Sequence, residues 1–281
     1  MLLVRELPIT REVIDAAPSL KLIQRPGDHL PVMDLDRARE RGIYVCRLPS
    51  RIQGGAARDV AEHAFFLLLA VAKQHKRAEE KMRMRILGLP KTMRLQGKTL
   101  GLVGVGNTGK ELARLAIGFG MRVVAVKRTP DPTLAGELGL SFLGMMGDLP
   151  AVLAEADFVS LHLPMTPETV DFIGSREIGM MKDGAVLINI ARSHMVNKAA
   201  VHDALLSGKL GGVGLDVFWQ EPPDPDDPLL SLPHVIFTPH IAGDTVETEQ
   251  RLAELTAENV RLVARGDQPR YVVGIDVDAG S

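Results

Sequence analysis

The chain has 281 residues, of which 46% are hydrophobic and 24% are charged, and its formal net charge is −2. This length and apolar content suffice for one large domain or two ordinary ones and exclude a globally disordered chain. The near-neutral charge and the aromatic content of 4% argue against nucleic acid as a partner. A single cysteine, Cys46, excludes a disulfide scaffold and a cysteine-rich zinc module, and we expect no metal site. The longest apolar run, Ala64–Ala72, is too short to span a bilayer and no export signal is visible, so we expect a cytoplasmic protein with no membrane partner.

Short apolar runs alternate with helical patterns along the whole chain, which is typical of a parallel α/β sheet. In the first sixty residues the pattern predicts strands at Leu20–Gln24 and Ile43–Cys46. A helix is predicted between them at residues 34–41, and Gly42 ends it. This block therefore predicts a small α/β unit of its own.

A long helix is predicted next, from about Ala57 to Met84. Its segment Ala64–Ala72 is apolar on every side, so we expect it to be buried between domains or at a subunit interface. Residues 75–94 hold seven Lys or Arg and two Asp or Glu. This charge is open to two interpretations, a nucleic-acid patch or a solvated helix end or dimer arm, and the scarce aromatics favour the second.

The central block predicts a larger set of strands. They are expected at Thr99–Val103, Met121–Val126, 157–161, 185–189, 211–215 and 235–238, with helices between most of them. The first of these helices is predicted at Lys110–Ile117. After this block comes one more amphipathic helix, at about Val246–Ala264, which ends at Gly266 and precedes a last strand and a loose tail. We therefore expect a doubly wound parallel sheet as the main domain.

A glycine motif, Gly104-Val105-Gly106-Asn107-Thr108-Gly109, follows the first strand of the central block. The pattern alone is weak, but here it leaves an apolar strand and opens a helix, which is the context of a dinucleotide-binding fingerprint. Gly104 permits the tight turn, Gly106 lets the backbone approach a pyrophosphate, and Gly109 lets helix and strand pack closely. The free amides near Asn107 and Thr108 would face the phosphates.

The end of the following strand bears on which dinucleotide is bound. An acidic residue that holds the adenine ribose is expected about 20 residues after the motif, but Lys127, Arg128 and Thr129 stand there. Two cations and a hydroxyl suit a ribose 2′-phosphate, so NADP is the favoured cofactor. The alternative is that these charges face solvent and that the protein accepts NAD.

Polar side chains also follow apolar strands in the second half of the chain. They are Arg192, Asp216, Glu221 and His240. Because ligands of an open α/β sheet bind beyond the carboxyl ends of its strands, we expect a site there.

Six stretches in this order resemble the D-isomer-specific 2-hydroxyacid dehydrogenase family, which includes phosphoglycerate, glyoxylate and hydroxypyruvate reductases. They are Val60–His63, Gly104–Gly109, Leu161–Thr169, Ile188–Arg192, Leu215–Pro222 and Thr238–Gly243. The resemblance implies a Rossmann dinucleotide-binding domain at residues 75–243. It also implies a flavodoxin-like α/β substrate domain, built from 1–74 and 244–281, with the active cleft between the two. A homodimer formed through the helix near Ala57 and the residues after it is the expected assembly.

The resemblance also implies roles for single residues. His240 matches the acid/base residue and Glu221 its partner carboxylate, a pairing that favours a protonated imidazole. Arg192 matches the residue that holds the substrate carboxylate and polarises its carbonyl, and Asp216 matches a contact to the nicotinamide carboxamide. The other positions expected beside the cofactor are Leu163, Pro164, Thr169, Ile190, Ala191, Ala242 and Gly243.

Three features depart from the family pattern. Ser193 and His194 stand where a glycine step is usual, so His194 would enter the cleft or face solvent. The loop expected to bind the substrate carboxylate is Gly27-Asp28-His29, in which an inward Asp28 would repel an anion. We also expect the substrate domain to lack its usual first strand and helix, which would expose a strand edge.

We therefore expect NADP-favouring reduction of a 2-oxo acid to its D-2-hydroxy acid, or the reverse. Two alternatives remain open, because a fold does not imply a function. One is a non-enzymatic or weakly active scaffold or sensor that binds the cofactor. The other is a dinucleotide-dependent enzyme for a related anionic substrate. The Arg192, Glu221 and His240 set favours the dehydrogenase.

Overall fold

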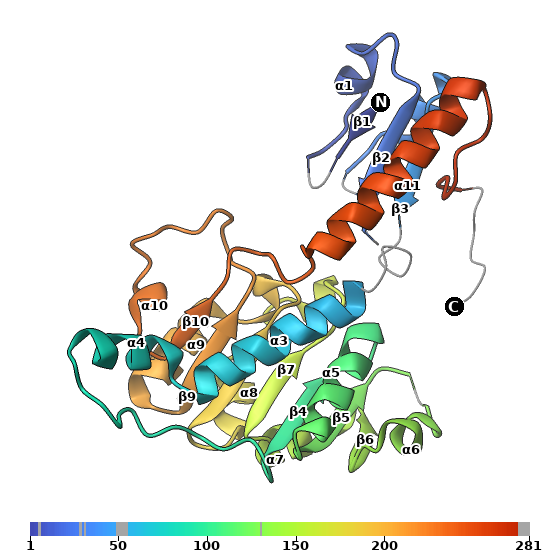
Figure 1. Ribbon diagram of the computed structural model, residues 1–281. Helices are drawn as coiled ribbons and strands as arrows, with labels where there is room; N and C mark the ends of the chain where they lie inside the picture. The colour runs from blue at the N-terminus through green and yellow to red at the C-terminus, as the bar shows by residue number, and fades with distance from the viewer. Residues whose placement is uncertain (5–6, 28–29, 31, 49–55, 130, 275–281) are drawn as a thin grey trace. The chain divides into compact units, whose positions relative to one another are not determined.

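The computed structural model describes residues 1–4, 7–27, 30, 32–48, 56–129 and 131–274. These form two compact units, Ala57–Gly243 and the combination of Met1–Ala56 with Asp244–Ser281 (Figure 1). One division falls at Gly243. The other division falls at Ala56 and not at residue 74, because the first apolar helix packs on the larger sheet.

The larger unit contains, in the described part of the chain, a parallel sheet of seven strands in the order β10-β9-β8-β7-β4-β5-β6. Chain order runs outward from β4 in one direction and from β7 in the other, so the topological switch point lies between β4 and β7. This arrangement confirms the doubly wound α/β fold. The strands are β4 (Thr99–Val103), β5 (Arg122–Lys127), β6 (Phe142–Met145), β7 (Phe158–Leu161), β8 (Ala185–Asn189), β9 (Leu210–Leu215) and β10 (Val235–Phe237).

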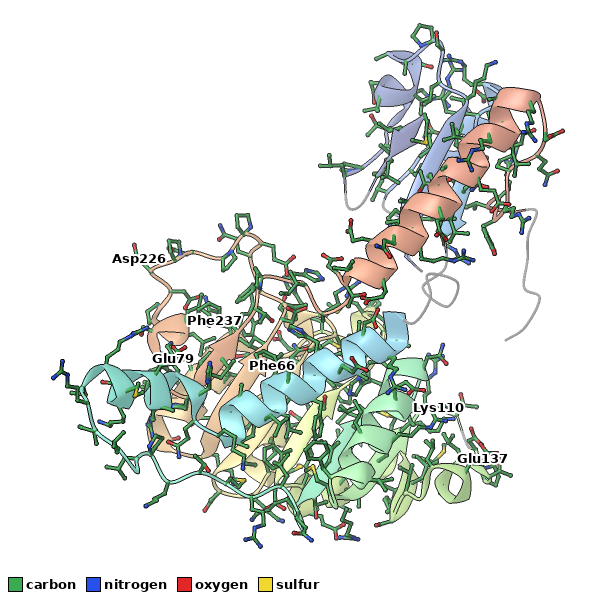
Figure 2. The ribbon with its side chains drawn as sticks, viewed as in Figure 1. Phe66, Glu79, Lys110, Glu137, Asp226 and Phe237 are labelled. Atoms are coloured by element: carbon green, nitrogen blue, oxygen red, sulfur yellow. The ribbon has the colours of Figure 1, made fainter. Side chains whose placement is uncertain are left out.

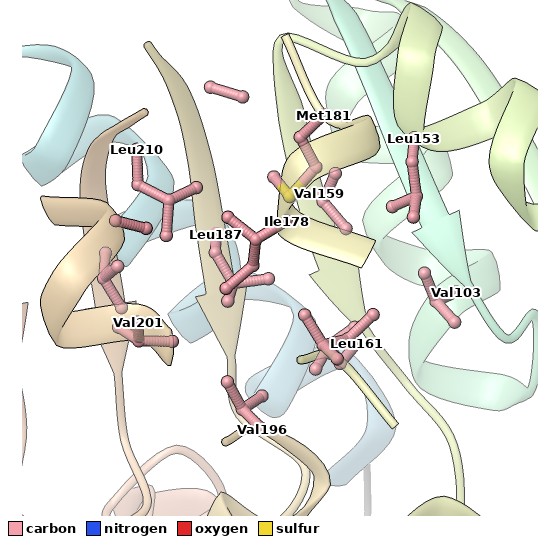
Figure 3. Close-up of a cluster of buried hydrophobic side chains, with 14 of the residues drawn as sticks. Val103, Leu153, Val159, Leu161, Ile178, Met181, Leu187, Val196, Val201 and Leu210 are labelled. Atoms are coloured by element: carbon pink, nitrogen blue, oxygen red, sulfur yellow. The ribbon is translucent and has the colours of Figure 1, made fainter. Parts of the chain in front are cut away.

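Helices cover both faces of this sheet (Figure 1). One apolar cluster joins the strands to α7 (Leu149–Glu155), α8 (Ser175–Met180) and α9 (Lys198–Ser207), and Figure 3 shows part of it. The cluster on the other face includes side chains of α3, α5 and α6. The remaining helices of the unit are α3 (Ala56–Ala72), α4 (His75–Arg83), α5 (Asn107–Gly118), α6 (Leu134–Leu138) and α10 (Pro228–Ser231).

The long helix predicted over residues 57–84 is two helices. Gln74 adopts a left-handed backbone conformation with φ of 51° and separates α3 from α4. Helix α3 lies against its own sheet, where Gly212 and Gly214 of β9 leave room for Val71 and Leu67. Phe66, on the outer side of α3, is 47% exposed in this single chain (Figure 2), so the expected burial at a subunit interface stays a prediction.

The smaller unit is built on a three-stranded parallel sheet in the described residues, with the order β1-β2-β3. Its strands are β1 (Leu2–Leu3), β2 (Leu22–Pro26) and β3 (Tyr44–Leu48), and its helices are α1 (Arg11–Asp15), α2 (Leu35–Glu40) and α11 (Val246–Arg265). Gln24 of β2 bonds to Thr256 and Asn259 of α11, at 2.7 and 2.9 Å. The expected last strand is a single antiparallel bridge from Val272 to Cys46 of β3.

None of the described helices is long and apolar enough to cross a membrane. In the same part of the chain, no group of three or more His, Cys, Asp or Glu side chains is arranged to hold a metal ion.

Candidate active site

The polar residues singled out in the sequence lie at one edge of the larger sheet. Strands β8, β9 and β10 are neighbours and parallel, so their carboxyl ends lie side by side. Arg192 follows β8, Asp216 follows β9, and His240 follows β10. The topology alone therefore gathers these side chains at the edge where α/β proteins bind ligands.

His240 and Glu221 form a hydrogen-bonded pair. The ring atom Nδ1 lies 2.9 Å from Glu221 Oε2, and because a carboxylate only accepts hydrogen bonds, Nδ1 is the donor. The backbone N–H of Phe218 donates to the other oxygen, Oε1, at 3.1 Å and so fixes the carboxylate. Side-chain exposures of 47% for His240 and 41% for Glu221 leave the pair accessible to a substrate. The second ring nitrogen of His240, Nε2, is the one that can exchange a proton with it.

Asp216 is buried behind this pair, with an exposure of 1%. Its Oδ1 accepts from Thr238 Oγ1 at 2.5 Å and from the N–H of Ile241 at 3.0 Å, and its Oδ2 accepts from the N–H of Ala242 at 2.8 Å. Burial opposes its ionisation, but the donors, with His63 the strongest, outweigh burial and lower the pKa of Asp216. Asp216 thus holds the loop that carries His240, a role that the sequence analysis missed.

Arg192 stands apart from the pair in this conformation. Its Nη1 donates to the carbonyl of Ala191 at 2.7 Å, and its side chain is exposed. Among the described residues it makes no hydrogen bond to Glu221 or His240. An exposed guanidinium that is bonded only to the carbonyl of the preceding residue can turn toward an anion.

The Ser193 and His194 departure has a structural explanation. Ser193 is buried, and its Oγ donates to the carbonyl of Phe218 at 2.7 Å. This bond joins the turn after β8 to the segment that leads to Glu221. His194 is exposed, with its Nδ1 3.3 Å from Ser193 Oγ.

The glycine loop has the geometry that a dinucleotide phosphate needs. Gly104 has φ of +97°, and a Cβ there would lie 2.7 Å from the carbonyl oxygen of His162. A Cβ at Gly109 would lie 2.7 Å from the carbonyl oxygen of Gly104, so helix and strand are in close contact. Gly106 is the N-cap of α5 and faces open space, which leaves the amides of Asn107 and Thr108 accessible to an anion. The residues present therefore fit the phosphates of a dinucleotide.

The turn after β7 borders this loop. Leu163 Cδ2 would lie 3.0 Å from a Cβ at Gly104, and Thr169 Oγ1 donates to the carbonyl of Pro164 at 3.0 Å. Burial lowers the pKa of His162 to about 4, so this imidazole is neutral at neutral pH and brings no charge to the loop.

The remaining residues predicted to line the site differ in how far they are buried. Ile190 is buried in the apolar cluster that contains α3, so only its backbone can face a ligand. Ala242 is buried and bonded to Asp216, and a Cβ at Gly243 would lie 3.5 Å from Val60. In the smaller unit Gly27 has φ of +97°. Asp28 and His29 lie outside the described residues.

The two basic residues at the end of β5, Lys127 and Arg128, have different surroundings. Lys127 Nζ lies 2.9 Å from Asp131 Oδ2, and this contact lowers the pKa of Asp131. Asp131 also accepts from the N–H of Leu134, which leads into α6. Arg128 and Thr129 are exposed. Of the three residues expected to select a 2′-phosphate, Lys127 is already paired with an anion.

Known proteins are similar to this chain in sequence and in fold. Residues 65–242 match the family model for the D-isomer specific 2-hydroxyacid dehydrogenase, NAD binding domain. The chain is 38% identical over 280 residues to a glyoxylate reductase of Korarchaeum cryptofilum, a match that covers 96% of this chain and 81% of that one. The TT0316 protein of Thermus thermophilus has a TM-score of 0.83 at 39% identity, with 97% of this chain and 85% of that chain covered. The D-lactate dehydrogenase of Lactobacillus jensenii, solved with NAD+, has a TM-score of 0.79 at 26% identity and the same coverage.

A doubly wound sheet with this glycine loop and an imidazole–carboxylate pair at its carboxyl edge defines a dinucleotide-dependent oxidoreductase. The chain belongs to the D-isomer specific 2-hydroxyacid dehydrogenase family, as the six ordered stretches predicted. Its reaction class is hydride transfer between a nicotinamide cofactor and a 2-oxo or 2-hydroxy acid. A purely non-enzymatic scaffold is not favoured, because the relatives are enzymes.

The glycine loop yields a prediction with a matched control on the same helix. Gly109→Ala should weaken binding of the dinucleotide at least tenfold, because the new methyl meets the backbone of Gly104 and displaces the loop. Gly118→Ala, also on α5, points into open space and should leave binding unchanged. Titration of cofactor fluorescence measures both variants. Equal affinity of the Gly109→Ala protein and the wild type would contradict the close-packing argument.

Proposed function

We propose that this chain reduces a 2-oxo acid to the D-2-hydroxy acid, with NADPH as the preferred reductant, and works as a homodimer. The bond between His240 Nδ1 and Glu221 Oε2 carries the catalytic part of this proposal. A bound nicotinamide cofactor supplies the hydride that reduces the carbonyl carbon. What this chain must add is a proton for the carbonyl oxygen and a partner for the substrate carboxylate.

His240 is the proton donor in this proposal. With Nδ1–H engaged by Glu221, a protonated ring presents its second proton on Nε2. The carboxylate of Glu221 favours the charged ring before the transfer and keeps its orientation afterwards. In the oxidative direction the neutral ring takes the proton back through the same nitrogen.

Arg192 binds the substrate carboxylate in this proposal. Its planar guanidinium matches a carboxylate with two parallel hydrogen bonds, and turning away from Ala191 costs one exposed hydrogen bond. The same cation polarises the adjacent carbonyl as negative charge develops on its oxygen. Glyoxylate is the first substrate to test, because the relative from Korarchaeum cryptofilum is a glyoxylate reductase.

Substitution of the three site residues tests this assignment. His240→Ala should lower kcat by about 10²–10⁴-fold and leave cofactor affinity nearly unchanged, because the ring acts only in proton transfer. Arg192→Ala should raise KM for the 2-oxo acid and lower kcat together, because it serves binding and polarisation. Glu221→Gln should move the pH profile of kcat/KM toward lower pH, because it removes the charge that favours the protonated ring.

Steady-state kinetics with a panel of 2-oxo acids measures these effects. His202→Ala serves as the control, because His202 lies on α9, away from the carboxyl edge of the sheet. Wild-type turnover in the His240→Ala protein would exclude this mechanism.

Arg128 is the residue on which NADP preference depends in this proposal. Lys127 is held by Asp131, whereas Arg128 and Thr129 are exposed after β5. An arginine binds a phosphate dianion through charge-assisted hydrogen bonds, which NAD cannot offer because it lacks the 2′-phosphate.

The two basic residues should therefore behave differently. Arg128→Ala should weaken NADPH binding about ten- to a hundredfold and leave NADH binding nearly unchanged, since the lost bond involves only the 2′-phosphate. Lys127→Ala should have the smaller effect on NADPH, because Asp131 already pairs with that ammonium. Isothermal titration with both cofactors is the measurement. Equal wild-type affinities for NADPH and NADH would rule out the preference.

An exposed apolar strip supports the homodimer. It lies on α4 and on the segment after it, and its members are Met82, Met84, Ile86, Leu87 and Leu89, of which Leu87 is 82% exposed. Large side chains gathered on a surface in this way are typical of protein interfaces. A second copy of the chain is the partner that the family resemblance implies.

Light scattering coupled to size exclusion tests this assembly at micromolar concentration. The wild type should have the mass of a dimer, and Leu87→Glu should shift the equilibrium toward monomer by placing a charge in an apolar interface. Leu206→Glu on α9, also at an exposed leucine, should leave the mass unchanged. A monomer mass for the wild type would refute the proposed dimer.

A further inference from the structure

We infer that His63 and Thr238 are positioning residues for the acid/base histidine. They hold the buried carboxylate of Asp216, which in turn holds the loop that carries His240. This inference rests on the proposed role of His240 and extends it to two side chains that do not touch the reacting atoms.

The number of available protons shows which group donates in each hydrogen bond of the network formed by His63, Thr238 and Asp216. Thr238 Oγ1 lies 2.5 Å from Asp216 Oδ1 and 2.7 Å from His63 Nε2. A hydroxyl has one proton, and the ionised Asp216 can only accept, so Thr238 donates to Asp216. Thr238 must then accept from His63, so Nε2 of His63 carries a proton. The same Nε2 lies 3.5 Å from Asp216 Oδ1 and adds a second, weaker contact.

The network ties together three segments of the larger unit. His63 belongs to α3, Asp216 follows β9, and Thr238 follows β10. Helix α3 is fixed on the sheet by the close approach of Leu67 to Gly214, and Phe66 lies next to His63 with ring centroids 5.6 Å apart. His63, which anchors the network, therefore lies on a helix that is packed against the sheet and not on a loop.

The network holds the His240 loop from both sides. Thr238 precedes His240 by two residues, and its N–H donates to the carbonyl of Leu215 at 3.0 Å. Ile241 follows His240 directly, and its N–H donates to the same Asp216 oxygen that Thr238 reaches. The carboxylate thus clamps the chain on each side of the catalytic ring.

The backbone of His240 needs such support. Its φ is +57°, a left-handed conformation that a residue with a side chain adopts when surrounding contacts impose it. That conformation directs the ring toward Glu221 Oε2 at 2.9 Å. Loss of the Thr238 hydroxyl removes one donor from a buried carboxylate and one acceptor from His63. The loop should then relax, and the imidazole should leave Glu221.

The test compares Thr238→Val, which keeps the shape of the side chain and removes the hydroxyl, with Thr238→Ser, which keeps the hydroxyl. Thr238→Val should lower kcat at least tenfold. Thr238→Ser should restore most of the activity. Thr99→Val is the matched control, because Thr99 is buried at the opposite end of the sheet, where β4 begins.

A second readout needs no substrate. In ¹⁵N-histidine NMR of the cofactor-free protein, the Nδ1–H signal of His240 should be present in the wild type, Thr238→Ser and Thr99→Val. In Thr238→Val it should shift or disappear. An unchanged signal together with unchanged kcat would overturn the inference. An intact signal pattern in a wild type that reduces no 2-oxo acid would instead refute the proposed function and leave the loop network supported.

His63 supplies an independent variant in case Thr238→Val folds poorly. His63→Leu removes the proton donor from a side chain that is 16% exposed and should lower kcat several-fold with the same NMR change. His63→Gln, which keeps an N–H donor, should recover part of the loss. Because both residues act through one carboxylate, the double variant His63→Leu/Thr238→Val should be little worse than Thr238→Val alone. Fully additive losses would show that the two residues act separately.

Discussion

Close contact between helices and the parallel sheet, at positions where only glycine fits, is the constraint on which the larger unit depends. A Cβ at Gly109 would meet the backbone of Gly104, and Cβ atoms at Gly212 and Gly214 would meet Val71 and Leu67 of α3. These contacts bring α5 and α3 near enough to the sheet for their polar residues to act at its carboxyl edge. The phosphate-facing amides and the His63 anchor both follow from this packing, although they lie on different helices.

The same packing explains why a buried charge is tolerated behind the proposed acid/base pair. A carboxylate without donors in such surroundings would protonate, because burial disfavours the charged form. Asp216 receives donors from two backbone amides and the Thr238 hydroxyl, with the His63 ring nearby, so its pKa falls despite burial. The sheet supplies the position, the loop supplies the donors, and the carboxylate in return fixes the loop.

The sequence predicted the sheet well for a physical reason. Strands of a parallel sheet are covered on both faces, so they appear as continuous apolar runs, and Thr99–Val103 and residues 185–189 have the predicted bounds. The break between α3 and α4 was not predictable, because a left-handed Gln74 leaves no mark in a helical pattern. The family stretches located Asp216 but not its contacts, which depend on the direction of a side chain.

Contacts between side chains could not be predicted from the sequence. Lys127 was assigned to a 2′-phosphate on sequence alone, although an ammonium and a carboxylate four positions apart, here Lys127 and Asp131, can meet across a turn. His63 lies in the resembling stretch Val60–His63, and Thr238 lies in the stretch Thr238–Gly243. Spacing along the chain cannot reveal a hydrogen bond between residues 175 positions apart. The family motifs identified the positions of these residues, and the fold shows the hydrogen bonds that connect them.

The stability that the buried carboxylate of Asp216 contributes depends on pH. Because the pKa of Asp216 is lowered in the folded state, the stability that it contributes is complete above the ordinary range of an aspartate. That stability is lost only as the pH falls through the lowered value. The carboxylate that anchors the His240 loop therefore loses its charge only at acid pH, below the ordinary range of an aspartate.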